Sequence, residues 1–347
     1  MKKFISKCFL FVLLWFTPLI LFLRFGQLYY HHSEYPMWLH TIKVLQSKFD
    51  SKGVIVGDSR AMAGIDPEIL GPSFYNLSFG GGTPLEGYFT LRKILAKGNR
   101  PELLIFSYAP FHLEIDDVFF ERSVKYDFYD WKEIHEIFYV LNKDRNRFWK
   151  EKGGTLNKYS YFLSFLDCYW IKLKWPFYYS AELGNMIVQP RISENRKIYE
   201  TISRQKGWHS FGLSEFSEGL NPEACNDSLD LKKILDEGLR LTCALARKHK
   251  IPMVYTIMPF NESSYKRLSK DYLQQYRDFF TAMQKEFPEV KFYYEPFSYD
   301  NSFFGDPSHL NVRGKDRFSN ELKARLVSDH LYTEIFLIPD EKPAGEQ

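Results

Sequence analysis

The feature that most constrains this chain is a long apolar run at its N-terminus. The run covers residues 4–25 and carries only two charges, Lys7 and Arg24, near its ends. A helix needs about 20 mostly apolar residues to cross the hydrocarbon core of a membrane. Nothing in the run is polar enough to form a second face, which argues against a buried helix of a soluble protein. We therefore predict a transmembrane helix within residues 1–25, where Pro18 is tolerated.

The charges before the run and the residues after it predict how this helix is inserted. Lys2, Lys3 and Lys7 precede most of the apolar stretch, and such charges stay on the cytoplasmic side. A cleaved signal peptide would end in small residues of the A-x-A type, and residues 19–32 lack that pattern. We favour an uncleaved signal anchor over a cleaved signal, followed by a tether over residues 26–50 and a large extracytoplasmic part.

Composition excludes several classes of site. The net charge is +3 and the basic residues are scattered, which argues against a nucleic-acid partner. The cysteines, Cys8, Cys168, Cys225 and Cys243, have no C-x-x-C spacing, so we predict no zinc cluster and no cofactor. The sequence leaves open whether any of the last three pair. Aromatic residues make up 18% of the chain, which favours a thick core, with a sugar-stacking or membrane-facing surface as alternatives.

Beyond the tether, short apolar runs alternate with helical patterns. This alternation is typical of βαβ units and predicts a parallel sheet. Strands are predicted at residues 53–56, 74–78, 101–107, 251–257 and 290–294. Helices are predicted at residues 37–48, 84–96, 228–248, 262–287 and 311–327.

The alternation pauses over residues 111–225, an aromatic-rich and irregular stretch that we interpret as a large helical insertion. The charged tail over residues 339–347 is predicted to be disordered. Ligands of open α/β sheets bind at the carboxyl ends of the strands. Four polar or glycine-rich turns follow predicted strands and fall at such ends, at residues 57–59, 80–82, 107–110 and 306–309.

Two of these turns carry residues suited to acyl chemistry. A serine becomes a good nucleophile when a histidine, itself oriented by a carboxylate, takes its proton. Ser59 ends the sequence Gly-Asp-Ser after the first strand, and Asp306 and His309 share one late loop. Taken singly, each has an ordinary explanation: a helix cap for the serine and a loop position for the histidine.

Together the blocks resemble the SGNH (GDSL-type) hydrolase and acyltransferase superfamily. Its first block, a strand running into G-D-S, matches residues 54–59; its second, N-L-x-x-x-G-x-T, matches residues 76–83; and its last, D-x-x-H-L-N-x-x-G, matches residues 306–314. The resemblance implies a flavodoxin-like, three-layer α/β fold over residues 51–338, interrupted by the insertion.

The resemblance also implies roles for single residues. Ser59 would be the nucleophile, His309 the general base and Asp306 the residue that orients it. The backbone N–H groups of Ser59 and Gly81 would form the oxyanion hole, which stabilises the tetrahedral intermediate. We further expect five residues near the substrate: Asp58, Arg60, Gly82, Tyr108 and Asn261.

One block of the superfamily is missing. Its G-x-N-D motif after the third strand supplies an asparagine as a third oxyanion donor, and here the chain has Ser107, Tyr108, Ala109 and Pro110. Ser107 or Tyr108 could take over this task. A membrane anchor, a large insertion and the loss of this block resemble envelope O-acetyltransferase-type SGNH proteins, which act beside a multi-pass membrane acyltransferase.

We therefore expect serine-dependent O-acyl transfer or O-acyl ester hydrolysis on a cell-envelope polysaccharide or lipid, through an acyl-Ser59 intermediate. A general lipase or esterase and a catalytically silent glycan-binding scaffold are the alternatives. The resemblance places the anchor in a bacterial inner membrane, with the N-terminus in the cytoplasm and the main domain in the periplasm.

Overall fold

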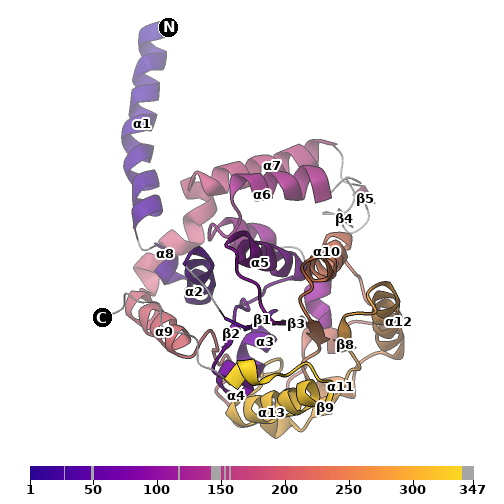
Figure 1. The fold of residues 1–347 in the computed structure, drawn as a ribbon. Coiled ribbons are helices and arrows are strands. Elements are labelled where there is room, and N and C mark those ends of the chain that lie inside the picture. Colours follow the sequence, from indigo (N-terminus) through magenta and orange to yellow (C-terminus); the bar gives the residue numbers. More distant parts are fainter. Residues whose placement is uncertain are drawn as a thin grey trace. The chain divides into compact units, whose positions relative to one another are not determined.

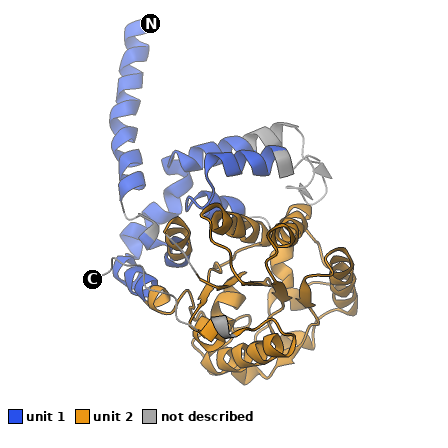
Figure 2. Cartoon of the chain, in the orientation of Figure 1, with its two compact units in different colours: residues 1–39, 119–200 blue, residues 40–118, 201–347 orange. Residues whose placement is uncertain are grey.

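The computed structural model describes residues 1–26, 28–47, 51–115, 118–141, 150–151, 154–155 and 158–337. It is a mixed α/β structure with a parallel central sheet and an apolar N-terminal helix (Figure 1). The chain divides into two compact units, residues 1–39 with 119–200 and residues 40–118 with 201–347 (Figure 2). The predicted disordered tail, residues 339–347, and residues 27 and 48–50 of the predicted tether lie outside the described residues.

The larger unit contains a five-stranded sheet in the order β2-β1-β3-β6-β8, and every neighbouring pair is parallel. This confirms the predicted parallel sheet. All residues of β1 and β3 are buried, as expected for strands covered on both faces. The strands are β1 (Gly53–Gly57), β2 (Phe74–Asn76), β3 (Leu103–Ser107), β6 (Met253–Thr256) and β8 (Lys291–Tyr293).

Helices pack on both faces of this sheet. Ile55 and Ile105, which pair in register, belong to a buried cluster that includes Phe318 and Leu322 of α13. Phe106 points the other way, against Gly87 of α5. The helices of this unit are α3 (Ser59–Gly64), α4 (Pro67–Leu70), α5 (Pro84–Ala96), α10 (Lys233–His249), α11 (Glu262–Tyr265), α12 (Lys270–Glu286) and α13 (Val312–Ser328).

The single helix predicted over residues 262–287 is wrong, because two helices, α11 and α12, occupy this stretch. Ser269 lies between them, and its hydroxyl accepts hydrogen bonds from the N–H groups of Asp271 at 3.2 Å and Tyr272 at 3.4 Å. This cap satisfies donors at the start of α12 and makes a new helix start there. A short parallel pair, β7 (Phe260–Asn261) with β9 (Ser298–Tyr299), was also not predicted.

The smaller unit is helical and contains α1 (Lys2–Phe25), which is long and apolar enough to cross a membrane. Further elements of this unit are α6 (Trp131–Glu136), α7 (Lys158–Lys172), the 3-10 turn η5 (Pro176–Tyr179), α8 (Ser180–Val188) and the strands β4 (Lys150–Glu151) and β5 (Gly154–Thr155). Two helices run from one unit into the other: α2 (Tyr35–Gln46), where a helix was predicted over residues 37–48, and α9 (Ile192–Arg204).

The contact between α5 and α10 generates a prediction about stability. A Cβ on Gly238 would lie 2.9 Å from the backbone N and Cα of Leu85. We expect Gly238→Ala to force the helices apart and to lower the free energy of unfolding by about 1–3 kcal/mol. Urea unfolding of the full chain in detergent, followed by circular dichroism, measures this change.

The matched control is Gly184→Ala in α8, where a Cβ would meet nothing within 4 Å. There the substitution should stabilise its helix by roughly 0.5–1 kcal/mol. Equal effects of the two substitutions would contradict the close approach of α5 and α10.

Candidate active site

Ser59 lies at the turn between β1 and α3. Asp58 caps α3, and one oxygen of its carboxylate accepts hydrogen bonds from the N–H groups of Arg60 at 2.8 Å and Ala61 at 3.2 Å. Ser59 is therefore the first residue of the helix and is partly exposed at the carboxyl end of the sheet. Its own N–H belongs to the first helical turn, where backbone donors have no intrahelical acceptor.

The three predicted catalytic side chains meet in the structure. The Nε2 atom of His309 lies 2.8 Å from Oγ of Ser59, although the two residues are 250 positions apart. The Nδ1 atom of His309 lies 2.8 Å and 2.9 Å from the two carboxylate oxygens of Asp306. Because an ionised carboxylate only accepts, Nδ1 is the donor, and Nε2 of the neutral ring is left to accept the serine proton.

The surroundings of Asp306 stabilise the ionised form of its carboxyl group. Burial disfavours the ionised carboxyl, but hydrogen bonds from the His309 ring and from the N–H groups of Ser308 and His309 outweigh burial and hold the pKa of Asp306 below its usual value. Both N–H groups lie 2.8 Å from the same oxygen. Asp306 therefore stays ionised at neutral pH and can stabilise a protonated His309.

The loop that carries this pair is closed on itself. Phe304 and Leu310 form an antiparallel bridge, and the N–H of Gly305 donates to the carbonyl of His309 at 2.9 Å. Directly after the loop, Asn311 caps α13 by accepting from the N–H of Gly314 at 3.1 Å. The imidazole is thus held between a small hairpin and the start of a helix.

A segment of the predicted insertion, residues 207–212, covers one face of this imidazole. The Phe211 ring stacks on His309, with centroids 4.6 Å apart and planes 19° apart. The rings of His209 and Phe211 meet edge-to-face, with centroids 5.1 Å apart. The segment is tied down at Trp208, whose Nε1 donates to the carbonyl of Ala63 at 2.7 Å. The only local signal was the cluster of two aromatic residues and a histidine between Gly207 and Gly212.

Two close backbone approaches hold this segment in place. A Cβ on Gly207 would lie 1.7 Å from the carbonyl oxygen of Asn76, and the φ angle of Gly207 is +93°. A Cβ on Gly212 would lie 2.3 Å from the carbonyl carbon of Gly305. Only glycine fits at both positions. The segment therefore lies directly against the block after β2 and against the loop that carries His309.

The predicted second block, residues 76–83, packs against the nucleophile turn. The buried Asn76 amide donates to the carbonyls of Ala61 at 3.1 Å and Ile65 at 3.0 Å, which ties β2 to α3. Gly81 has φ +70°, in the left-handed region that favours glycine. A Cβ on Gly82 would lie 3.1 Å from the carbonyl oxygen of Gly57. The oxyanion-hole role of Gly81 stays a prediction.

Two residues predicted near the substrate, Asp58 and Arg60, are buried, and their side chains are bonded to other groups of the protein. The Arg60 guanidinium forms an ion pair with Glu223 at 2.7 Å, and both side chains are almost fully buried. The second oxygen of Asp58 accepts from the N–H of Ala109 at 2.7 Å and lies 3.7 Å from Nε2 of His112. Sequence reasoning missed Glu223, because nothing local marks it as the partner of Arg60.

The remaining candidates, Tyr108 and Asn261, also lie inside the fold. The Tyr108 ring is fully buried, and its hydroxyl would be 2.6 Å from a Cβ on Gly87 in α5. Asn261 caps α11 and donates to the carbonyls of Ser217 at 3.1 Å and Gly219 at 2.8 Å. Ser107 is fully buried as well. The side chains of residues 107–109, at the end of β3, are all buried. None of them is exposed to take the place of the missing asparagine.

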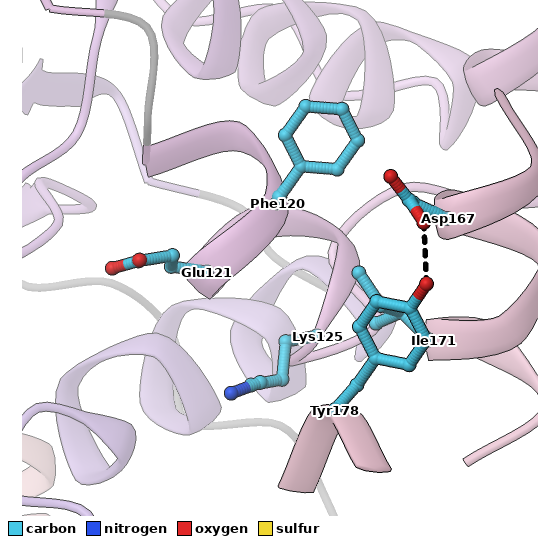
Figure 3. A pocket seen from close by; sticks show the side chains of 6 residues that line it. All are labelled: Phe120, Glu121, Lys125, Asp167, Ile171 and Tyr178. Atoms are coloured by element: carbon cyan, nitrogen blue, oxygen red, sulfur yellow. Dashed lines mark hydrogen bonds between the residues drawn. The ribbon is translucent and has the colours of Figure 1, made fainter. Parts of the chain in front are cut away.

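The smaller unit contains a separate pocket of about 230 Å³. Three of its polar side chains have partners: the Tyr178 hydroxyl donates to Asp167, as Figure 3 shows, and Lys125 pairs with Glu182 at 2.7 Å. It is lined by Phe120, Glu121, Lys125, Asp167, Ile171 and Tyr178. Across the described ranges, no three His, Cys, Asp or Glu side chains are grouped to hold a metal ion.

No protein-family model matches the chain, and no curated protein matches it. The interpretation of the site therefore depends on its own geometry.

The environment of His209 predicts a pH dependence of stability. Burial and the neighbouring His309 lower the pKa of His209 to about 4, from an ordinary value near 6.5. Between these values the unfolded chain binds a proton that the folded chain refuses, so stability falls as the pH falls. We expect His209 to account for a loss of about 2 kcal/mol between pH 7.5 and pH 5.

Urea unfolding of wild type and His209→Gln at both pH values measures this contribution. The variant should lose less stability on acidification than the wild type. The same loss in both proteins would show that His209 takes up its proton freely in the folded state.

Proposed function

We propose that this chain is a serine-dependent O-acyltransferase or O-acyl esterase of the SGNH superfamily. One observation carries the proposal: Ser59, His309 and Asp306 form a continuous chain of hydrogen bonds with contacts of 2.8 Å at each step. A loop histidine placed only for packing would have no reason to contact both a serine in the first turn of a helix and a carboxylate.

The sheet supports the same membership. Numbered along the chain, its strands follow the order 2-1-3-4-5, which is the order of flavodoxin-like sheets. The nucleophile follows the first of these strands, and the loop of His309 comes after the last, β8. In such a sheet both positions belong to the edge where substrates bind.

In the first half of the reaction, Oγ of Ser59 attacks the carbonyl carbon of an ester as its proton passes to Nε2 of His309. The imidazolium is stabilised by Asp306, and the oxyanion is stabilised by backbone N–H groups, for which Ser59 and Gly81 are the candidates. The tetrahedral intermediate then breaks its bond to the leaving alcohol, which takes the proton from His309. An acyl-Ser59 ester remains.

In the second half, an acceptor hydroxyl gives its proton to His309 and attacks the acyl group, and Ser59 is regenerated. A sugar hydroxyl as acceptor makes the protein a transferase, and water makes it an esterase. Phe211 shields one face of the imidazole, which restricts the approach of water on that side. Because the ring blocks any molecule on that side, transfer wins over hydrolysis only if the acceptor displaces water from the remaining side.

The anchor suggests where the acceptor is found. With Lys2, Lys3 and Lys7 in the cytoplasm, α1 would hold the main domain on the periplasmic side of the inner membrane. The substrates within reach are envelope polysaccharides and lipids. A multi-pass membrane acyltransferase is the partner that would bring an acyl group across the bilayer.

The proposed chemistry predicts covalent labelling of one residue. A fluorophosphonate probe should label the full chain in detergent, and Ser59→Ala should abolish the labelling. Asp306→Asn should slow it by roughly 10³–10⁴-fold, because His309 loses the partner that sets its tautomer. If the folded wild type remains unlabelled, the chain has no activated serine and the proposal fails.

The proposed orientation of the chain in the membrane predicts which cysteine a membrane-impermeant reagent can reach from outside. Cys225 is exposed, whereas Cys168 and Cys243 are buried, and burial raises the pKa of both buried thiols. In a Cys8→Ser background, a membrane-impermeant maleimide should label intact spheroplasts, and Cys225→Ser should remove the signal. Labelling that requires lysis would place the main domain in the cytoplasm.

A further inference from the structure

A corner of the smaller unit lies beside the apolar helix, well inside its length. The indole of Trp175, just before η5, stacks on Phe16 of α1, with ring centroids 5.1 Å apart and planes 3° apart. Phe16 precedes the end of α1 at Phe25 by nine residues. At 1.5 Å per residue, this is about 13 Å along the helix axis. Trp175 is therefore held at the level of the apolar run and not beyond its end.

The same corner exposes several large apolar side chains. Trp170 is 41% exposed, Leu173 38% and Phe177 77%, and the ring of Trp170 lies 5.4 Å from that of Trp175. We call Trp170, Leu173, Trp175 and Phe177 together the corner patch. Soluble proteins rarely leave such groups together in water, and exposed patches of this kind mark contact surfaces.

Aromatic residues extend the surface along α7. Tyr169 is 46% exposed and contacts Trp131, which is 42% exposed, at 5.2 Å between ring centroids. In Figure 1, α7 runs crosswise to α1, which belongs to the same unit. A helix that lies along the surface of a membrane has this orientation relative to a helix that spans it. Tryptophan and tyrosine are enriched at the level of lipid headgroups, where an apolar ring and a polar edge are both satisfied.

We propose that the corner patch enters the outer leaflet of the bilayer beside α1, with lipid acyl chains as its occupant. The proposal rests on the membrane span of α1 in the proposed function. Lipid is favoured because Trp175 is stacked at a level of α1 that must lie within a hydrocarbon core about 30 Å thick. At this depth, acyl chains surround any side chain that is not covered by protein.

The polar groups of the corner are compatible with this position. Lys172 and Lys174 lie between the patch residues in sequence, and both pair with Asp127, at 2.8 Å and 2.7 Å. Their charges are therefore partly neutralised next to the lipid. The corner consists of the end of α7, a turn at residues 173–175 and η5. In this turn the N–H groups of Leu173, Lys174 and Trp175 all donate to backbone carbonyls, as a low-dielectric environment requires.

The test uses a fluorescent probe on the full chain in lipid vesicles. Phe177→Cys, in a Cys8→Ser and Cys225→Ser background, is labelled with an environment-sensitive maleimide dye. We expect lipids brominated on their acyl chains to quench most of its emission. Aqueous iodide should quench this probe several-fold less than it quenches a probe at position 187. A probe on Leu173→Cys repeats the measurement from the turn that follows α7.

The matched control is Ile187→Cys, another exposed apolar position of the same unit. Ile187 is 80% exposed and lies in α8, which contacts the turn η1 (Leu28–His31) beyond the end of α1. Its probe should be open to iodide. Equal iodide quenching at positions 177 and 187, with no quenching by brominated lipid, overturns the proposal. That result is also expected if a protein partner, absent from the vesicles, covers the patch.

Two further readouts separate this proposal from the proposed function. A probe on the native Cys8, with Cys225→Ser, reports whether α1 itself lies in the bilayer. If this probe is quenched by lipid and the probe at residue 177 is not, the patch proposal fails while the anchor stands. Fluorophosphonate labelling of Ser59 in the same vesicles tests the chemistry independently.

Discussion

The buried carboxylate of Asp58 is the interaction on which the candidate site depends. An ionised carboxylate is costly to bury unless its oxygens accept hydrogen bonds. Here one oxygen caps α3 through the N–H groups of Arg60 and Ala61, and the other accepts from Ala109 after β3. One side chain thus sets the turn that presents Ser59 and joins it to the neighbouring strand end. It also explains why the chain after β3 has no free donor at Ala109.

A second constraint comes from backbone packing around the histidine. Gly207 and Gly212 let residues 207–212 approach Asn76 and Gly305 more closely than any side chain would allow. Phe211 is placed on the imidazole as a result. The site is therefore built from three separate parts of the chain: the Ser59 turn, the His309 loop and a segment that the sequence assigned to the insertion.

Much of the fold follows from local signals. Apolar runs such as Val54–Val56 predict buried strands, and the helical periods between them predict parallel pairing, which the structure confirms. Ser59, His309 and Asp306 could be picked out from the sequence because each lies in a sequence motif and the motifs occur in the expected order along the chain. Phe211 and Glu223 were not, since each acts through a partner about 100 or more positions away. The break at Ser269 was missed because the helical period continues across it, although the serine caps a new helix.

The separation of Ser59 from His309 has a consequence for how the chain acquires reactivity. The two residues are 250 positions apart, and contacts of such long range form late, after local helices and strands. During synthesis the serine emerges early, and His309, its proposed base, follows late. A nascent or truncated chain that stops before Asp306 carries a serine that no base activates. If the proposed function holds, the Ser59 hydroxyl becomes a nucleophile only after the loop of His309 has folded against the turn that carries the serine.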